Sequence, residues 1–172
     1  ASDEIIKKKN KTNFINKYNI AIENYNLDNK IKTINELKSI IAKKDKTYSP
    51  LALYFVIDNN LIQNEKEINK LFDILIEETN LEKEIKNLII YKKGLFNAEI
   101  LSENELIQLL SPIITSQSVW ESHALYLLGE YFMAQNQKQK AKEFYEKILL
   151  LNNGNQNISL EARKILKRDF SE

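Results

Sequence analysis

Apolar side chains recur at helical spacing along most of the chain, in runs that are separated by short polar segments. The stretch LYLLGEYFMAQNQKQKAKEFYEKIL, residues 125–149, shows the pattern best. It has two apolar runs on either side of the polar segment QNQKQK, and each run places an apolar residue at every third or fourth position. This spacing predicts two helices joined by a short turn.

Two small residues stand at corresponding places in these runs. Gly129 lies inside the first run, and Ala141 lies twelve residues later at the start of the second. Helices joined by a short turn cross closely, and a residue without a bulky side chain at the crossing lets the two backbones approach. We therefore expect Gly129 and Ala141 to meet where the helices cross.

The same spacing of twelve recurs earlier in the chain. It joins three further pairs: Ile22 and Ile34, Val56 and Ile68, and Gly94 and Leu106. The second members of the four pairs are 34, 38 and 35 residues apart, close to the period of roughly 34 residues that helical-hairpin repeats show. Four hairpin units follow, at residues 15–48, 49–82, 87–120 and 122–155.

The two ends of the chain differ from these units. The segment NISLEARKILKRDF has a helical apolar period, which predicts a capping helix at residues 156–172 because a stack of repeats needs a terminal element with a polar outer face. Residues 1–14 contain the run KKKNK and no apolar stripe. They are predicted to form an exposed helical extension or a linker. The fold class is all-α: a stack of about four hairpins with a C-terminal cap.

Capping residues indicate where several helices begin. Ser49 before Pro50 reads as an N-cap with Pro at the first helical position. Three further pairs have the spacing of a capping box or its Asn analogue: Asn64 and Glu67, Ser102 and Glu105, and Ser118 and Glu121.

Composition narrows the class of protein. A chain of 172 residues, 43% hydrophobic and 28% charged, fits one globular domain, and only three Gly and two Pro favour helix. The net charge of +1 gives no field that would drive nucleic-acid binding, so no nucleic acid is expected as a partner. Without Cys, disulfides and thiolate metal sites are excluded. The chain begins without Met, which suggests a truncated or processed product whose front part could hold an anchor or signal.

Catalytic chemistry is not indicated. The sequence has one His, no Cys and no Gly-rich phosphate loop, so we expect no catalytic residues, no metal site and no cofactor. His123 is interpreted as a groove or surface residue beside Trp120, and Trp120 as a buried residue between the third and fourth units or as a partner anchor. The run Lys7–Lys11 is interpreted as a solvated helix surface or as a contact for phosphates or lipid headgroups.

The pattern in residues 122–155 resembles the tetratricopeptide repeat, in which Gly at position 8 and Ala at position 20 form the packing pair. Gly129 and Ala141 occupy these positions. Leu128, Phe132 and Tyr145 match positions 7, 11 and 24, whereas Leu125, Ile148 and Asn153 depart from the usual Trp, Ala and Pro at positions 4, 27 and 32. The resemblance implies a right-handed α-solenoid of TPR-like hairpins.

In this repeat family, positions 2, 5, 9 and 12 of the first helix of each unit face a concave groove. The resemblance implies a partner-binding groove that includes Asn19, Glu23, Leu53, Ile57, Asn60, Tyr91, Leu95, His123, Tyr126, Glu130 and Met133. Such a groove suits an amphipathic helix or an extended segment. It lacks the basic residues with which TPR co-chaperones hold a terminal carboxylate. The chain's own terminal helix, or a second copy in a homodimer, is an alternative occupant.

Longer stretches, among them TYSPLALYFVIDN, IYKKGLFNAEIL and LEARKIL, are similar to the bacterial TPR-like family that includes the ancillary subunit of the SecYEG translocon. The resemblance implies a scaffold tethered to the inner membrane by a helix upstream of Ala1, with residues 1–14 as a juxtamembrane segment and the repeats in the periplasm. Its partners would be the translocon, secreted chains or periplasmic chaperones. Lysines just after a spanning helix favour the cytoplasm instead, so the side of the membrane stays open. A soluble adaptor in envelope assembly or cell division and a regulatory domain of an enzyme complex are the alternatives.

Overall fold

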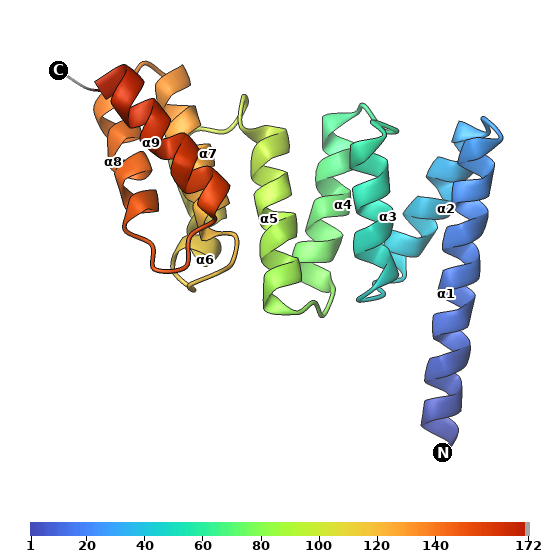
Figure 1. The fold of residues 1–172 in the computed structure, drawn as a ribbon. Helices are drawn as coiled ribbons and strands as arrows, with labels where there is room; N and C mark the ends of the chain where they lie inside the picture. The colour runs from blue at the N-terminus through green and yellow to red at the C-terminus, as the bar shows by residue number, and fades with distance from the viewer. Residues whose placement is uncertain (171–172) are drawn as a thin grey trace. The chain divides into compact units, whose positions relative to one another are not determined.

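Helices joined by short turns make up the computed structural model, which describes residues 1–170 (Figure 1). Over these residues the chain forms nine α-helices and no strand, which confirms the all-α class. The chain divides into two compact units, residues 1–82 and 83–172.

The first unit contains α1 (Ser2–Asn26), α2 (Lys30–Ala42), α3 (Tyr48–Asp58) and α4 (Glu65–Glu78). Each helix packs against the next in the chain, and α1 also contacts α3 while α2 contacts α4. The two hairpins therefore lie side by side, first helix against first helix and second against second. Their shared core consists of fully or almost fully buried aliphatic and aromatic side chains: Ala21, Leu37, Ile40, Ile41, Ala52, Leu53, Val56, Ile68, Phe72 and Leu75.

The crossing of α1 and α2 is filled by Ala21 and Thr33. Both residues are fully buried, and the Thr33 hydroxyl donates a hydrogen bond of 3.3 Å to the Ala21 carbonyl. The sequence interpretation placed Ile22 and Ile34 here, one residue later, but both are half-buried. Small side chains at the crossing let the backbones approach, so the register of this hairpin is shifted by one residue from the predicted one.

Only the C-terminal half of α1 takes part in this packing. Its contact stripe runs through Phe14, Tyr18, Ala21 and Tyr25, spaced by three or four residues, whereas residues 1–13 are exposed throughout. Figure 1 shows this end of α1 extending past the end of α2. The stripe ends at Phe14 because the preceding positions on the same face carry polar residues that gain nothing from burial.

The second unit contains α5 (Lys83–Asn97), α6 (Glu103–Ile114), α7 (Glu121–Ala134), α8 (Lys138–Leu149) and α9 (Gln156–Phe170). Successive helices from α5 to α9 pack together, and α5 and α9 each also contact α7. In Figure 1, α9 lies along both α7 and α8, with Ala162 and Ile165 buried beneath it. The last helix thus covers the last hairpin.

Within the α7–α8 hairpin, Gly129 faces Tyr145. A Cβ built on Gly129 would lie 2.7 Å from Cε1 and 2.8 Å from Cζ of the Tyr145 ring. Ala141 is fully buried, but the nearest atoms to Gly129 all belong to Tyr145. The nearest contact of Gly129 is therefore an aromatic ring one turn further along α8 than Ala141.

The predicted capping residues have mixed outcomes. Ser102 and Glu105 form a capping box at α6, and Asn64 accepts a hydrogen bond from the Glu67 amide at α4, as predicted. Ser49 lies inside α3, where its hydroxyl donates to the Ile40 carbonyl at 2.7 Å. Ser118 does not cap α7, because that helix begins after Trp120. In both wrong cases the hydroxyl is used by a tertiary hydrogen bond instead.

The turns inside three of the hairpins share one conformation. Asp28, Asn60 and Asn136 each follow the first helix of a hairpin with positive φ values of 59°, 49° and 58°. At each turn this residue and the next donate their amides back to the last turn of the helix, which is the Schellman arrangement. Asp and Asn tolerate this left-handed conformation better than other residues with a Cβ.

Candidate partner-binding surface

Aromatic rings connect the first helices of the two hairpins in the second unit. Tyr91 of α5 meets His123 of α7 with ring centroids 5.5 Å apart and an interplanar angle of 73°. Trp120, just before α7, also meets His123, with ring centroids 5.0 Å apart and an interplanar angle of 63°. All three residues are half-buried. Edge-to-face contacts of this kind favour a fixed geometry, so the cluster is a rigid, largely apolar surface.

Burial keeps this aromatic cluster neutral. Desolvation lowers the pKa of His123 below its ordinary value, and its Nδ1 atom is buried without a hydrogen-bond partner. Burial also raises the pKa of Tyr91. At neutral pH both side chains are uncharged, because burial in a low dielectric disfavours the charged form. The surface can therefore contact apolar groups without desolvating a charge of its own.

Glu84 at the start of α5 fixes the loop that leads to Trp120. Its carboxylate accepts hydrogen bonds from the Ser118 hydroxyl at 2.9 Å and the Val119 amide at 2.5 Å. The Trp120 indole donates to the Glu84 carbonyl oxygen at 3.0 Å. This network holds Trp120 in place, and the indole N–H is used within the protein. Sequence reasoning did not identify Glu84, although it lies 34 residues before Ser118, one repeat period away.

The charge of Glu84 follows from the same contacts. Partial burial alone would raise the pKa of this carboxyl, but the hydrogen bonds from Val119, Ser118 and Asn87, together with the charge of Lys83, outweigh burial and lower its pKa. Glu84 is therefore ionised at neutral pH, the state in which a carboxylate accepts these bonds most strongly.

A second cluster lies further along α7. The rings of Tyr126 and Tyr145 are 5.9 Å apart, and the Tyr145 hydroxyl donates a hydrogen bond of 2.5 Å to Glu130. Tyr145 is fully buried. Its pKa is raised well above the ordinary value, first by burial and then by the bond to Glu130. Glu130, predicted as a groove residue, is exposed, and it connects α7 to α8 by accepting this hydrogen bond.

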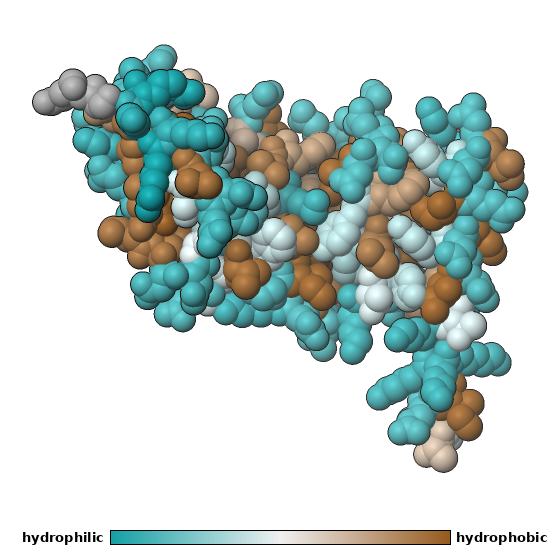
Figure 2. All heavy atoms as spheres, viewed as in Figure 1, coloured by the Kyte–Doolittle hydropathy of each residue, from teal (hydrophilic) through white to brown (hydrophobic). Residues whose placement is uncertain are grey.

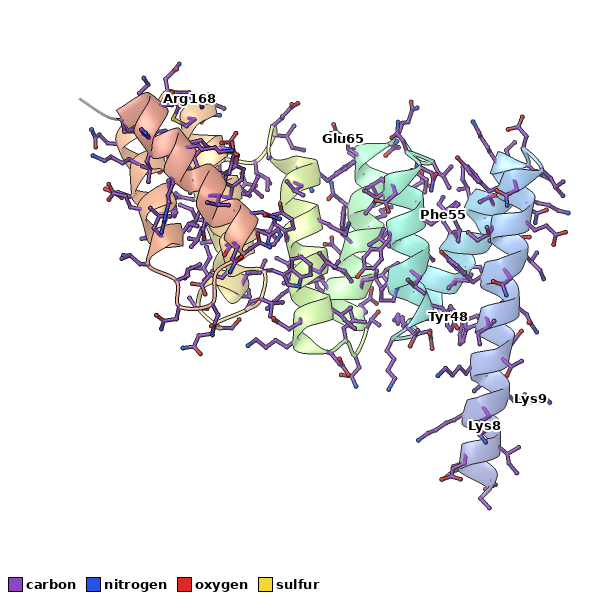
Figure 3. All side chains as sticks on the ribbon, viewed as in Figure 1. Lys8, Lys9, Tyr48, Phe55, Glu65 and Arg168 are labelled. Atoms are coloured by element: carbon purple, nitrogen blue, oxygen red, sulfur yellow. The ribbon has the colours of Figure 1, made fainter. Side chains whose placement is uncertain are left out.

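The first unit has an equivalent pair of aromatic contacts between its first helices. Tyr18 of α1 meets Tyr48 of α3 at 6.1 Å, and Tyr25 meets Phe55 at 5.1 Å with perpendicular rings. Figure 3 shows Tyr48 and Phe55 on α3, on the side toward α1. The two rings on each helix are seven residues apart, which is two helical turns. Both contacts therefore lie along one stripe of half-buried rings. The one-residue register error in α1 caused the sequence analysis to miss Tyr18 and Tyr25.

The predicted groove residues of the first unit are not gathered on this stripe. Asn19 and Glu23 are exposed; Asn19 lies one residue from Tyr18, and Glu23 lies two residues from Tyr25. Leu53 is 0% exposed and belongs to the core, so it offers no surface to a partner. Asn60 lies in the turn after α3 and has a positive φ of 49°, so it belongs to the turn and not to the face of the helix. Ile57 is half-buried on α3.

The predicted residues of the second unit lie on α5 and α7. The structure brings Tyr91 and His123 into ring contact, while Tyr126 and Met133 are half-buried further along α7. Leu95 is 49% exposed one turn after Tyr91. A surface accessible to a partner therefore centres on Tyr91, His123 and Leu95.

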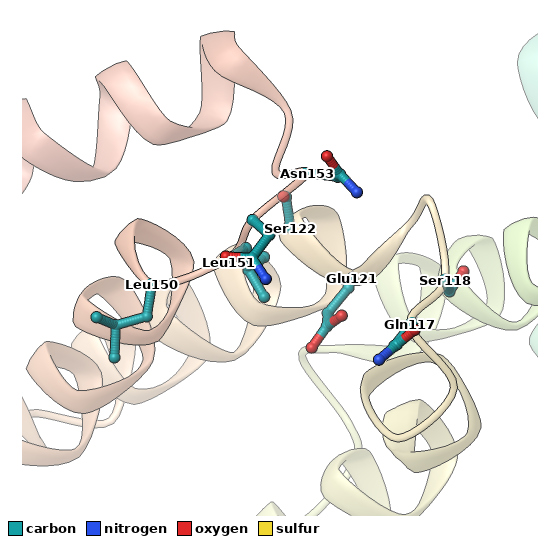
Figure 4. A pocket seen from close by; sticks show the side chains of 8 residues that line it. Gln117, Ser118, Glu121, Ser122, Leu150, Leu151 and Asn153 are labelled. Atoms are coloured by element: carbon teal, nitrogen blue, oxygen red, sulfur yellow. The ribbon is translucent and has the colours of Figure 1, made fainter.

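A polar cleft of about 360 Å³ lies at the start of α7, beside the turn that follows α8 (Figure 4). It is lined by Gln117, Ser118, Glu121, Ser122, Leu150, Leu151, Asn152 and Asn153. Its serines are used internally, because Ser118 donates to Glu84 and Ser122 accepts from the Asn155 amide at 2.9 Å. Burial raises the pKa of Glu121. No pairing of a nucleophile with a base is formed among these lining residues.

No family model, curated protein sequence or solved structure matches this chain. In residues 1–170, no group of three or more His, Cys, Asp and Glu residues could hold a metal ion. None of the helices within that range has the length and apolar character that crossing a bilayer requires.

Proposed function

We propose that this protein is a non-catalytic scaffold that binds a polypeptide segment along the first helices of its hairpins. The observation that carries the proposal is the aromatic contact between neighbouring first helices in each unit, Tyr18–Tyr48 and Tyr25–Phe55 in one and Tyr91–His123 in the other. Half-exposed rings held in fixed positions contribute contact area at little cost in conformational entropy. They suit the apolar side chains of an amphipathic helix or extended segment.

Recurrent polar contacts support a repeat of the tetratricopeptide type. Four hydrogen bonds between hairpins join residues at nearly constant intervals: 34 residues for Lys44 and Glu78, 34 for Glu84 and Ser118, 34 for Glu103 and Gln137, and 33 for Ser122 and Asn155. These intervals match a repeat of roughly 34 residues. We propose on this basis that the hairpins are TPR-like units of a right-handed solenoid, with α9 as its cap.

The cellular setting belongs to the proposal as well. The similarity of the quoted motifs to the family of the ancillary translocon subunit supports a scaffold held at the bacterial inner membrane, with secreted chains, the Sec translocon or periplasmic chaperones as partners. The neutral aromatic surface on α5 and α7 agrees with binding apolar segments of a non-native chain, because such segments expose large apolar side chains.

Peptide binding tests the function directly. The full chain would be titrated into labelled amphipathic and extended peptides and followed by fluorescence anisotropy. Replacing Tyr91 with Ala should weaken binding by about fivefold or more, the effect of losing a contact worth roughly 1 kcal/mol. The matched control is Phe144→Ala, which truncates a half-buried ring on the second helix α8.

Each variant must retain the helicity and melting temperature of the parent for this comparison to apply. A panel in which no peptide binds, or equal weakening by Tyr91→Ala and Phe144→Ala, would contradict the proposed binding surface.

A further inference from the structure

The exposed end of α1 carries a concentration of positive charge. Residues 1–17 hold five of the 25 Lys and Arg residues of the chain but only two of its 24 Asp and Glu residues, so the remainder is slightly acidic. Figure 3 shows Lys8 and Lys9 projecting from this part of the helix. The small net charge of the whole chain therefore conceals a basic segment at one end.

Two large apolar side chains lie in the same segment without any core to cover them. Ile5 is 66% exposed and Ile6 is 56% exposed. Figure 2 shows a small hydrophobic area within this otherwise hydrophilic end of α1. They are adjacent in the half of α1 that packs against no other helix, so together they offer a small apolar surface to a partner.

The helical geometry sorts the charges around these isoleucines. Lys9 follows Ile5 by four residues and Ile6 by three, and Lys8 follows Ile5 by three, so both lysines flank the isoleucines on one side of the helix. Asp3 precedes Ile6 by three residues and Glu4 precedes Lys8 by four, so the two carboxylates border this side of the helix. The side with the isoleucines thus carries two lysines with the carboxylates at its edges, and it points away from the contact stripe of α1.

We infer that residues 2–13 of α1 form a contact for an anionic lipid surface, with Ile5 and Ile6 entering the headgroup region and Lys8 and Lys9 pairing with lipid phosphates. Lysine stems lie along apolar surface while their ammonium groups reach the phosphates. Nucleic acid would also attract the lysines, but phosphodiester backbones do not bury isoleucine pairs. The lipid contact goes beyond polypeptide binding and does not depend on it.

Vesicle flotation tests the inference on the full chain. It should bind vesicles of equal parts phosphatidylcholine and phosphatidylglycerol at low salt, and bind vesicles of phosphatidylcholine alone much more weakly. Since each lysine near an anionic surface contributes about fivefold, Lys8→Gln with Lys9→Gln should lower the partition coefficient roughly 30-fold. Ile5→Ser with Ile6→Ser should remove the part of the binding that survives high salt.

The matched control is Lys66→Gln with Lys70→Gln, which removes the same charge from exposed positions on α4. Equal loss in the control, or binding unchanged by either pair of substitutions in α1, would overturn the lipid contact. Tighter binding to a labelled DNA duplex than to the anionic vesicles would overturn it in favour of nucleic acid. Because peptide binding is measured separately, loss of vesicle binding alone leaves the proposed scaffold function intact.

Discussion

The ring of Tyr145 lies against the backbone of Gly129, so closely that a Cβ on Gly129 would come within 2.7 Å of it. A ring carbon held in a packed core cannot move aside cheaply. The contact joins the two helices of the last hairpin at the point where the sequence pattern indicated a need for a small residue. It also sets the position of the Tyr145 hydroxyl, which reaches Glu130.

Replacing Gly129 with Ala should destabilise the chain. Overpacking costs about 1–3 kcal/mol, which exceeds the gain of up to about 1 kcal/mol from the higher helix propensity of Ala. Urea denaturation gives the free energy of unfolding. The control is Gly94→Ala, where the new Cβ would meet the mobile ends of Leu110 and Leu127 at 3.2 Å. Equal stability of the two variants would show that the contact with Tyr145 is not restrictive.

Tyr145→Phe removes the hydrogen bond to Glu130 and should lower stability at neutral pH by about 1–3 kcal/mol, the range for bonds to charged groups. The raised pKa of Tyr145 gives the deficit a pH dependence. The unfolded chain loses the phenol proton near pH 10 while the folded chain keeps it, so stability falls as pH rises above about 10. Denaturation at neutral and alkaline pH should therefore show the difference between parent and variant shrinking above that pH.

His123 should make the second unit sensitive to acid. Because burial lowers the pKa of His123, the unfolded chain takes up its proton near pH 6.5 before the folded chain does, and stability decreases as pH falls below that value. His123→Phe should remove this part of the pH dependence. Trp120 is the single Trp of the chain and touches His123, so its fluorescence reports both unfolding and protonation. Identical pH profiles for parent and variant would argue against a buried, neutral His123.

Asn136 should be replaceable by Gly but not by Val. Its φ of 58° lies in the left-handed region, which costs a residue with a Cβ about 1–2 kcal/mol and a β-branched residue the most. Asn136→Val should therefore lower the free energy of unfolding by at least about 1 kcal/mol, whereas Asn136→Gly should stay near the parent value. Thermal melts followed by circular dichroism distinguish the two, and equal melting temperatures would contradict the turn assignment.

The helices and their order follow from the apolar period, and the capping box at Ser102 follows from local chemistry, so both were predictable from the sequence. The one-residue register error in α1 has a physical cause. This helix continues past its packed half into exposed residues, so its apolar period does not show where the packed part begins. The helices cross at Ala21 and Thr33, one residue before the expected Ile22 and Ile34. Tyr18 and Tyr25 were missed for this reason.

The predicted site depended on more than periodicity. Leu53 is buried because α3 is apolar around most of its circumference, so no single face could be selected from the pattern. The network of Glu84, Ser118 and Trp120 joins residues 34 to 36 apart through side-chain geometry that no local signal specifies. Tyr91 and His123 were both predicted as groove residues from the family register, and the contact between their rings in the structure was not predicted.

The exposed first half of α1 affects how the chain behaves in solution. Residues 1–13 are exposed throughout, so their helical turns depend on propagation from the packed turns that begin at Phe14. Amide hydrogen exchange should therefore quicken progressively from Phe14 back toward Ser2, and trypsin should cut first at Lys7 to Lys11 while the remainder of the first unit stays intact. Binding of this segment to any surface would slow both amide exchange and tryptic cleavage. The two rates therefore report, without a label, whether the segment is bound.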